Sequence, residues 1–337
     1  MVKARKYVVT KIFQGQPKRS DYELVEEELP PLKDGEVLVK AEWISVDPYL
    51  RAYNRESPTP YDQFGFQVGV VQESKDPKYP VGSRVVSHKG WRDYVILNMS
   101  APFPNPATRH YKLPDIGNLS PSLAVGAVGM PGATAYISFF EIGKPKAGET
   151  VVVTGAAGAV GSLVGQIAKI KGCNVIGFTG SDKKAQSLKE ELGFDAAYNY
   201  RTVDVRKVLK EAAPNGVDIY FDNVGGEISS TIMYQMNNKG RVIVVGSISA
   251  YDSDPSDLPK VTILQPAILF KGLKVEAFLI WNSSQDEWNK AFADIVKWIQ
   301  SGQLKAKEHI SEGFDNIFDV YIGMLTGDNY GKAVIRV

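Results

Sequence analysis

The pattern of apolar and polar positions changes near Pro121 and divides the chain into two parts. Before this point, short runs rich in β-branched residues, such as 36–41 and 83–87, alternate with segments rich in proline, glycine and aspartate. Such a pattern is typical of a compact antiparallel β domain. Beyond it, residues 123–128 and 133–141 have the composition of two short helices.

A regular alternation of apolar strands and helical segments begins at Glu149, which predicts a parallel sheet flanked by helices. Strands are expected at 151–154, 174–178, 196–200, 218–222, 242–246 and 275–280. Helices are expected at 159–171, 183–192, 203–212, 228–236 and 285–300. This order matches the doubly wound parallel sheet of the Rossmann fold, which binds dinucleotides.

Strand-like composition returns from about Lys305 and continues to Val337, so we expect this tail to complete the first domain. The expected protein is therefore of the α/β class, with a β-rich domain at 1–125 that is completed by about 305–337. A Rossmann domain is expected at 126–304. Two domains also agree with a length of 337 residues, because single hydrophobic cores usually stop growing below this size.

The strongest local motif lies between the first strand and the first helix of the expected parallel sheet. Gly155, Gly158 and Gly161 follow the apolar run 151–154 with the spacing Gly-x-x-Gly-x-x-Gly. Small residues at such a turn let the backbone approach a pyrophosphate, whose charge then lies at a helix N-terminus. Because the flanking strands have the spacing of a βαβ unit, the motif predicts a dinucleotide site. A close-packed turn without a ligand is the alternative.

Cofactor specificity is expected at the end of the second strand, where NAD-binding proteins usually carry an acid. Thr179 or Gly180 takes that position here, and two lysines follow within 178–184. Tyr200 and Arg201 end the third strand. A missing carboxylate and nearby cations favour the 2′-phosphate of NADPH over NADH.

Two further segments follow strands of the same sheet. Asp222–Gly226 follows the fourth strand, and Gly246–Ser249 follows the fifth. Ligands in open α/β sheets bind outside the carboxyl ends of the strands, so both segments are expected to line the cofactor. Each could instead serve only as a turn or a helix cap.

Composition limits the partners of the chain. The 39 basic and 38 acidic residues give a net charge of +1, which does not favour binding to nucleic acid or to a membrane surface. No apolar run approaches the roughly 20 residues of a transmembrane helix, and we find no signal peptide, so a cytoplasmic location is expected. No metal site is expected, because the soft ligands Cys173, His88, His110 and His309 are scattered.

Several motifs in the same order resemble those of the zinc-independent medium-chain dehydrogenases/reductases. More narrowly, the chain resembles the family of prostaglandin reductases, leukotriene hydroxydehydrogenases and alkenal double-bond reductases. The motifs that carry this resemblance are Val46–Arg51, Val128–Tyr136, Ala156–Gly161, Phe221–Gly226 and Gly327–Lys332.

The resemblance implies a GroES-like substrate domain joined to a Rossmann domain, with the active site in the cleft between them. It implies NADPH-dependent reduction of a carbon–carbon double bond conjugated to a carbonyl group, as in ketone and aldehyde substrates. It also implies several roles in binding NADP(H). Ala157, Gly158, Ala159 and Val160 would hold the pyrophosphate, and Lys184 and Tyr200 the 2′-phosphate. The ribose and nicotinamide would be lined by Asn223, Gly246, Ser247, Ile248, Ser249 and Tyr251. The nicotinamide would also contact Phe278, Leu279 and Ile280, and Asn329 would close the site from the tail.

The identity of the general acid is open at this point. The family often has a tyrosine shortly before the sixth strand, and the position that aligns with it here is Phe270, which has no hydroxyl. Tyr49, which follows a proline in 47–49, is the first candidate for a catalytic tyrosine, and Tyr251 is the second. Tyr49 could equally be a packing residue, because buried tyrosines usually find some hydrogen-bond partner.

Two alternatives to an enone reductase remain. One is an NADPH quinone oxidoreductase of the same superfamily, and the other is a protein that binds the dinucleotide without turnover. The resemblance also implies a homodimer. The physiological substrate, whether an eicosanoid, a lipid-derived alkenal or a phenylpropenal, does not follow from the sequence.

Overall fold

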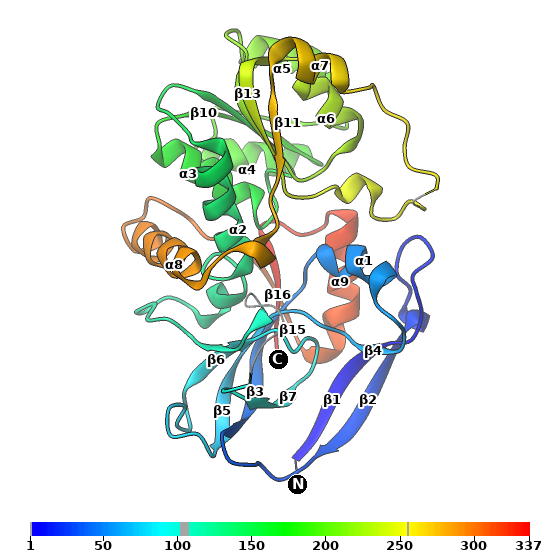
Figure 1. Ribbon diagram of the computed structural model, residues 1–337, viewed down its shortest axis with the longest axis vertical. Coiled ribbons are helices and arrows are strands. Elements are labelled where there is room, and N and C mark those ends of the chain that lie inside the picture. Colours follow the sequence, from blue (N-terminus) through cyan, green and yellow to red (C-terminus); the bar gives the residue numbers. More distant parts are fainter. Residues whose placement is uncertain (1, 102–107, 255) are drawn as a thin grey trace. The chain divides into compact units, whose positions relative to one another are not determined.

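We analysed a computed structural model, which describes residues 2–101, 108–254 and 256–337 (Figure 1). The chain forms two compact units. Unit 1 consists of Met1–Gly129, Trp281–Gln285 and Glu308–Val337, and unit 2 of Met130–Ile280 and Asp286–Lys307. Among the described residues, no helix has both the length and the apolar character needed to span a bilayer.

Unit 1 is built mainly from antiparallel strands. A small sheet has the order β2-β1-β4, and a larger one has the order β15-β16-β3-β5-β6-β8, with β7 paired to β3. The strands are β1 (Val2–Val9), β2 (Tyr22–Leu29), β3 (Glu36–Ser45), β4 (Tyr61–Asp62), β5 (Gln67–Ser74), β6 (Arg84–Ser87), β7 (Tyr94–Asn98), β8 (Tyr111–Lys112), β15 (Glu308–Glu312) and β16 (Lys332–Arg336). The short helix α1 (Tyr49–Tyr53) follows β3 directly.

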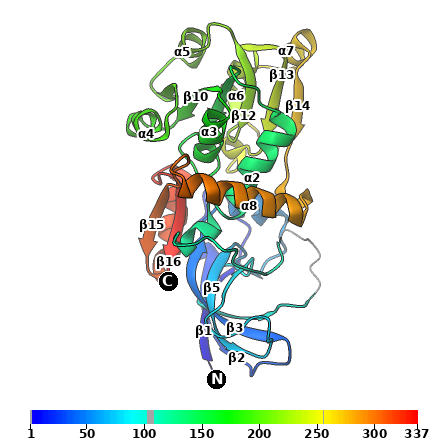
Figure 2. The same cartoon turned by 90° about the vertical axis from the view of Figure 1, so that its left-hand side faces the viewer.

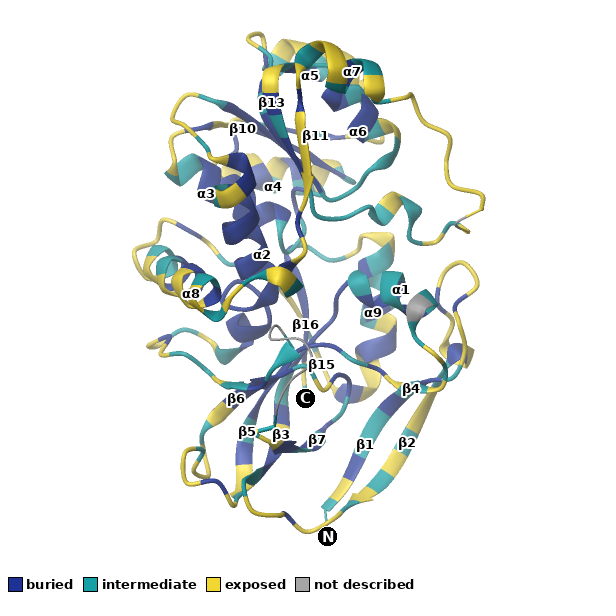
Figure 3. Cartoon of the chain, in the orientation of Figure 1, coloured by how far each residue is buried: buried dark blue, intermediate teal, exposed yellow. Residues whose placement is uncertain are grey.

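Strand β3 lies in the middle of the larger sheet, where its apolar side chains are shielded from solvent. It pairs with β5, β7 and β16, and its residues Val37, Val39 and Ile44 are almost fully buried. Figure 3 shows the contrast with β2, where buried residues are lacking and exposed positions are frequent. Trp91, Tyr7 and their apolar neighbours fill the core beneath, against α9 (Ile317–Thr326).

Unit 2 contains a six-stranded parallel sheet with the order β11-β10-β9-β12-β13-β14 (Figure 2). Its strands are β9 (Thr150–Thr154), β10 (Asn174–Thr179), β11 (Ala196–Asn199), β12 (Val217–Asp222), β13 (Met236–Val244) and β14 (Lys274–Ala277). The helices are α2 (Met130–Ser138), α3 (Gly161–Ile170), α4 (Asp182–Leu192), α5 (Val205–Ala212), α6 (Gly226–Met233), α7 (Gln265–Lys271) and α8 (Gln285–Gln300). The strand order reverses between β9 and β12, as in a doubly wound sheet.

Helices cover both faces of this sheet. Apolar residues of α5, α6 and α7 pack with Val152, Phe178 and Val242 on one face. Gly177 points to the opposite face, where a Cβ atom would lie 2.9 Å from the ring of Phe194, and Phe194 in turn contacts α3 at Gly165. Strand β9 is buried along its whole length, which explains the three consecutive valines at its centre, 151–153.

The fold class predicted from the sequence is confirmed, with local differences. The tail was expected to be strand-like, but it also contains the helix α9. Strand β13 begins at Met236 instead of Val242, because Met236 pairs with Val217 before a shift in register. Helix α7 was not expected, and only one of its residues, Ala267, is buried.

Candidate active site

The glycine turn of unit 2 joins β9 to α3, and its backbone conformation depends on glycine. Gly155 has a φ of +62°, a conformation that L side chains rarely adopt. A Cβ atom on Gly161 would lie 2.4 Å from the carbonyl oxygen of Gly155, so only glycine lets the helix start this close to the strand. A Cβ atom on Gly158 would lie 3.2 Å from its nearest neighbour, the carbonyl oxygen of Gly155. A turn with this close approach at a helix N-terminus fits the pyrophosphate of a dinucleotide.

The turn after β12 is held against the end of β9 by a buried network. Asn223 donates from its side-chain amide to the carbonyl of Thr154 at 2.7 Å, and its backbone N–H donates to the Thr154 hydroxyl. The carboxylate of Asp222 accepts from the N–H groups of Val224 and Gly225. These bonds fix the predicted cofactor residue Asn223 beside the glycine turn, where a Cβ atom on Gly155 would lie 3.3 Å from the Asn223 side chain.

The segment after β13 lies against the same turn. Gly246 approaches the carbonyl oxygen of Asn223 so closely that a Cβ atom would be 2.9 Å from it. The Ser249 hydroxyl donates to the carbonyl of Val224 at 2.6 Å, and the backbone N–H of Ser247 donates to the Tyr251 hydroxyl at 3.4 Å. The short helix Ile248–Ala250 lies between these contacts. The structure therefore brings together the residues that the sequence predicted at the ends of β9, β12 and β13.

The ends of β10 and β11 carry the predicted phosphate residues. Lys184 lies in the first turn of α4, where Ser181 is the N-cap and its hydroxyl accepts from the Lys184 N–H. Tyr200 follows β11. The guanidinium group of Arg201 lies 3.7 Å from the position of a Cβ atom on Gly180, the residue at which NAD-binding proteins usually carry an acid. The sequence indicated only that Arg201 ends the third strand, and the structure shows that its charged group lies beside Gly180.

The predicted cofactor residues in the segment after β14 differ in how far they are buried. Phe278 and Ile280 are buried, whereas Leu279 is 53% exposed. The backbone N–H of Phe278 donates to the carbonyl of Val244, which joins this segment to the end of β13. Phe270, the position that aligns with a family tyrosine, lies on α7 with 81% of its surface exposed.

In unit 1, Tyr49 begins α1 and its hydroxyl lies 3.1 Å from Nε2 of His88, which directly follows β6. The two rings belong to an aromatic cluster. The members are Tyr49, Tyr53, Phe64, Phe66, His88 and Trp281. The indole N–H of Trp281 donates to the Tyr53 hydroxyl at 2.9 Å. From the sequence, His88 stood out only as one of the scattered soft metal ligands, and nothing indicated this pairing, because 39 positions separate it from Tyr49.

Burial keeps both members of this pair uncharged near neutral pH. It lowers the pKa of His88 from 6.5 to about 4, and the positive charge of Lys89 acts in the same direction. Burial also raises the pKa of Tyr49 well above 10, with a smaller contribution from Asp47. At neutral pH the pair therefore consists of a phenol and a neutral imidazole, and either group can be the donor of the hydrogen bond between them.

A buried ion pair lies in the motif segments 47–51 and 327–332 of unit 1. Nζ of Lys332 is 3.2 Å from Asp47 and donates to the carbonyls of Val46 and Ala333, at 2.7 Å each. Both side chains are 4% exposed. Burial lowers the pKa of Lys332, and the charge of Asp47 opposes this shift. Arg51, which follows in the first motif, is also buried, with its guanidinium 5.7 Å from the ring centre of Phe13.

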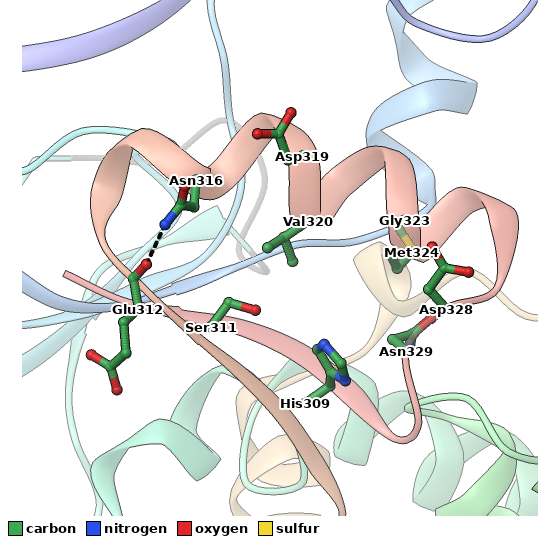
Figure 4. A pocket seen from close by; sticks show the side chains of 10 residues that line it. All are labelled: His309, Ser311, Glu312, Asn316, Asp319, Val320, Gly323, Met324, Asp328 and Asn329. Carbon is green, nitrogen blue, oxygen red and sulfur yellow. Dashed lines mark hydrogen bonds between the residues drawn. The ribbon is translucent and has the colours of Figure 1, made fainter.

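Asn329, the predicted cofactor residue of unit 1, lines a pocket of about 360 Å³ between β15 and α9 (Figure 4). The remaining lining residues are mostly polar or acidic. They are His309, Ser311, Glu312, Asn316, Asp319, Val320, Gly323, Met324 and Asp328. The Asn329 amide donates to the carbonyl of Gly331 at 2.7 Å. No member of the aromatic cluster is among these lining residues.

The described parts of the chain contain no group of three or more histidine, cysteine or acidic side chains that could hold a metal ion. Cys173 is buried, and its thiol contacts the carbonyl of Lys146. Burial raises the pKa of this thiol to about 11.

Comparison with known proteins identifies both parts of the chain. The family pattern described as the N-terminal domain of oxidoreductase matches residues 5–104, and the one described as zinc-binding dehydrogenase matches residues 159–298. Prostaglandin reductase 1 of Bos taurus is 44% identical over all of both chains. The NADPH-dependent curcumin reductase of Escherichia coli is 34% identical over 99% of this chain and 96% of its own.

The solved structures agree with these sequence relatives. The crystal structure of CurA from Vibrio vulnificus in complex with NADPH has a TM-score of 0.90 and 33% sequence identity, with 99% of each chain covered. A β-rich unit of this type, combined with a doubly wound dinucleotide-binding unit, defines a medium-chain dehydrogenase/reductase. Within that class, the chain belongs to the prostaglandin reductase family. The resemblance seen in the sequence motifs is thereby confirmed.

Proposed function

We propose that this protein reduces the carbon–carbon double bond of α,β-unsaturated ketones or aldehydes with NADPH as the hydride donor. The observation that carries the proposal is the carboxyl edge of the parallel sheet, where the glycine turn at 155–161, Asn223 and the segment 246–251 meet. Ligands of open α/β sheets bind at this edge. Membership in a family whose relatives are named prostaglandin and curcumin reductases supports the reaction class.

The residues at this edge fit the parts of NADPH. Ala157 to Val160 would hold the pyrophosphate, and Lys184, Tyr200 and Arg201 would surround the 2′-phosphate. Asn223, the segment 246–251 and Phe278 to Ile280 would orient the ribose and nicotinamide. When bound, the nicotinamide supplies a hydride for the β-carbon of the substrate.

The chain itself has to stabilise charge on the substrate. Negative charge develops on the carbonyl oxygen as the double bond is reduced, so a hydrogen-bond donor aimed at this oxygen lowers the barrier. The phenol groups of Tyr49 and Tyr251 are the candidates, and Tyr49 is favoured because a histidine already contacts its hydroxyl. A site lined by aromatic rings also excludes water, which strengthens such a hydrogen bond.

A direct assay tests the proposed reaction. The purified protein should consume NADPH, seen as a loss of its near-ultraviolet absorbance, when an alkenal or an aryl enone is added. The product should be the saturated carbonyl compound, identified by mass spectrometry. A quinone of similar size serves as the control, and activity should persist in the presence of a metal chelator. Faster turnover of the quinone, or no turnover of any enone, would contradict the proposal.

We include a homodimer in the proposal because the edge strand β14 and helix α7 leave apolar groups exposed. All four residues of β14 are exposed, and so are Leu269 (74%) and Phe270 (81%) on α7. An unpaired edge strand beside apolar side chains is a surface that a second copy can cover. The double variant L269K/F270K should therefore be monomeric by light scattering, whereas V81K, which changes an exposed valine of unit 1, should stay dimeric. A monomeric wild type would exclude this assembly.

A cytoplasmic location also belongs to the proposal, since the free thiol of Cys173 suits a reducing compartment. Fractionation of cells that express the protein would test it.

A further inference from the structure

The Tyr49–His88 pair has a geometry that goes beyond packing, and the inference drawn from it rests on the proposed enone reduction. Two polar side chains contact each other at 3.1 Å inside a cluster of aromatic rings. Both residues are half-buried, so each keeps part of its surface open to a ligand. Phe270 cannot act as the donor that the family resemblance implies, because it has no hydroxyl and its ring is 81% exposed.

The imidazole of His88 is held by rings on several sides. Phe66 lies edge-on at a centroid distance of 4.6 Å, Phe64 is stacked at 5.8 Å, and Trp281 lies edge-on at 5.9 Å. Such packing limits the rotation of the imidazole, so Nε2 stays directed at the Tyr49 hydroxyl. A polar group whose orientation is fixed by its surroundings is what a preorganised site requires.

The charges around the pair favour its neutral form. Lys89 lies next to His88 in the sequence, and its charge together with burial disfavours the imidazolium. His110 also lies close enough to interact with His88, and it is itself neutral because burial lowers its pKa to about 3. Tyr49 is influenced by Asp47 and Tyr53, which both oppose formation of a phenolate. The hydrogen bond therefore joins two neutral groups and can run in either direction.

We propose that His88 is a positioning residue for Tyr49. Its Nε2–H donates to the hydroxyl oxygen of Tyr49, which leaves the phenol hydrogen free to point at the carbonyl oxygen of the enone. Tyr49 is then the catalytic hydrogen-bond donor and remains a phenol throughout. The proton that completes the reduction at the α-carbon comes from solvent water. If the phenol instead donated its hydrogen to Nε2 of His88, the substrate oxygen would be left without this donor.

Steady-state kinetics of four variants test the proposal. Y49F should lower kcat for an enone about 100-fold, as expected for loss of one donor to a developing oxyanion. H88L should lower kcat about tenfold, as expected for loss of one orienting hydrogen bond. H88Q, whose side-chain amide supplies an N–H donor, should recover most of this loss. The double variant Y49F/H88L should be no slower than Y49F, because His88 acts only through Tyr49.

The KM for NADPH should stay unchanged in all four variants, which separates positioning from a general loss of structure. K78M, which removes an exposed lysine of the same unit, is the control and should keep the activity of the wild type. An unchanged kcat in H88L, or single effects that multiply in the double variant, would overturn the proposal.

A spectroscopic readout separates this inference from the proposed function. A saturated ketone bound together with NADP⁺ should show a carbonyl stretch at lower frequency in the wild type than in Y49F and H88L. A wild type that fails to turn over enones would contradict the proposed function. Absence of the frequency difference would contradict the role of the pair, whatever the turnover.

Discussion

Replacing Lys332 with methionine should lower the free energy of unfolding by about 3–5 kcal/mol, the cost typical of breaking a buried ion pair on one side. The side chains of Lys332 and Asp47 are each 4% exposed, so the Asp47 carboxylate would be left in the interior without its cation. The carbonyls of Val46 and Ala333 would also lose the donor that lies 2.7 Å from each of them. Methionine nearly keeps the length of the side chain, so the effect reports mainly on charge and hydrogen bonding.

Urea denaturation of the variant and of two companions measures this effect. K78M removes an exposed lysine of unit 1 and should change stability by less than about 0.5 kcal/mol. The double variant D47N/K332M should be more stable than K332M, because the unpaired charge is gone. A loss in K332M no larger than that in K78M would show that the pair contributes nothing to folding.

The second large effect is expected at the 2′-phosphate. R201A should raise the KM for NADPH about 10- to 100-fold, the range expected for loss of a charge-assisted hydrogen bond. The KM for NADH should change little, since NADH carries no phosphate at this position. The guanidinium of Arg201 lies beside Gly180, where no carboxylate competes for it. K184A should act in the same direction.

The ratio of the two KM values is the informative measurement, because it cancels effects on folding and turnover. K189A serves as the control, since Lys189 lies on the same helix α4 in its last turn and is exposed. Equal effects of R201A on NADPH and NADH would remove Arg201 from the phosphate site.

The parts of the fold that depend on local sequence could be predicted. Strands β9, β10 and β12 of the parallel sheet are almost entirely buried and stand out as apolar runs. All six strands of this sheet were located from the sequence, although every residue of β14 is exposed. Helix α9 was missed because apolar residues occupy most positions of Ile317–Thr326 and obscure its period, although the buried residues Ile317, Phe318, Tyr321 and Met324 have helical spacing. Helix α7 has no such face, since it buries a single side chain.

In the candidate site, too, local features could be predicted from the sequence and contacts between distant segments could not. The glycine turn is a local feature, so its sequence spacing was sufficient to locate it. The Tyr49–His88 pair and the Lys332–Asp47 pair join segments far apart in the chain, and their partners have no sequence motif in common. Such contacts arise from the strand pairing of unit 1, in which β16 lies beside β3 on one side and β5 joins β3 to β6 on the other.

The position of β16 also affects how the protein is made. A ribosome produces β3 early, but the strand that pairs with it on one side, β16, follows the whole of unit 2 in the sequence. The nucleotide-binding half can therefore finish folding while the first half still lacks a strand of its larger sheet. Until synthesis reaches residues 332–336, one side of β3 stays open at Trp43 to Ser45, and the nascent chain carries an unpaired strand edge of the kind that promotes aggregation.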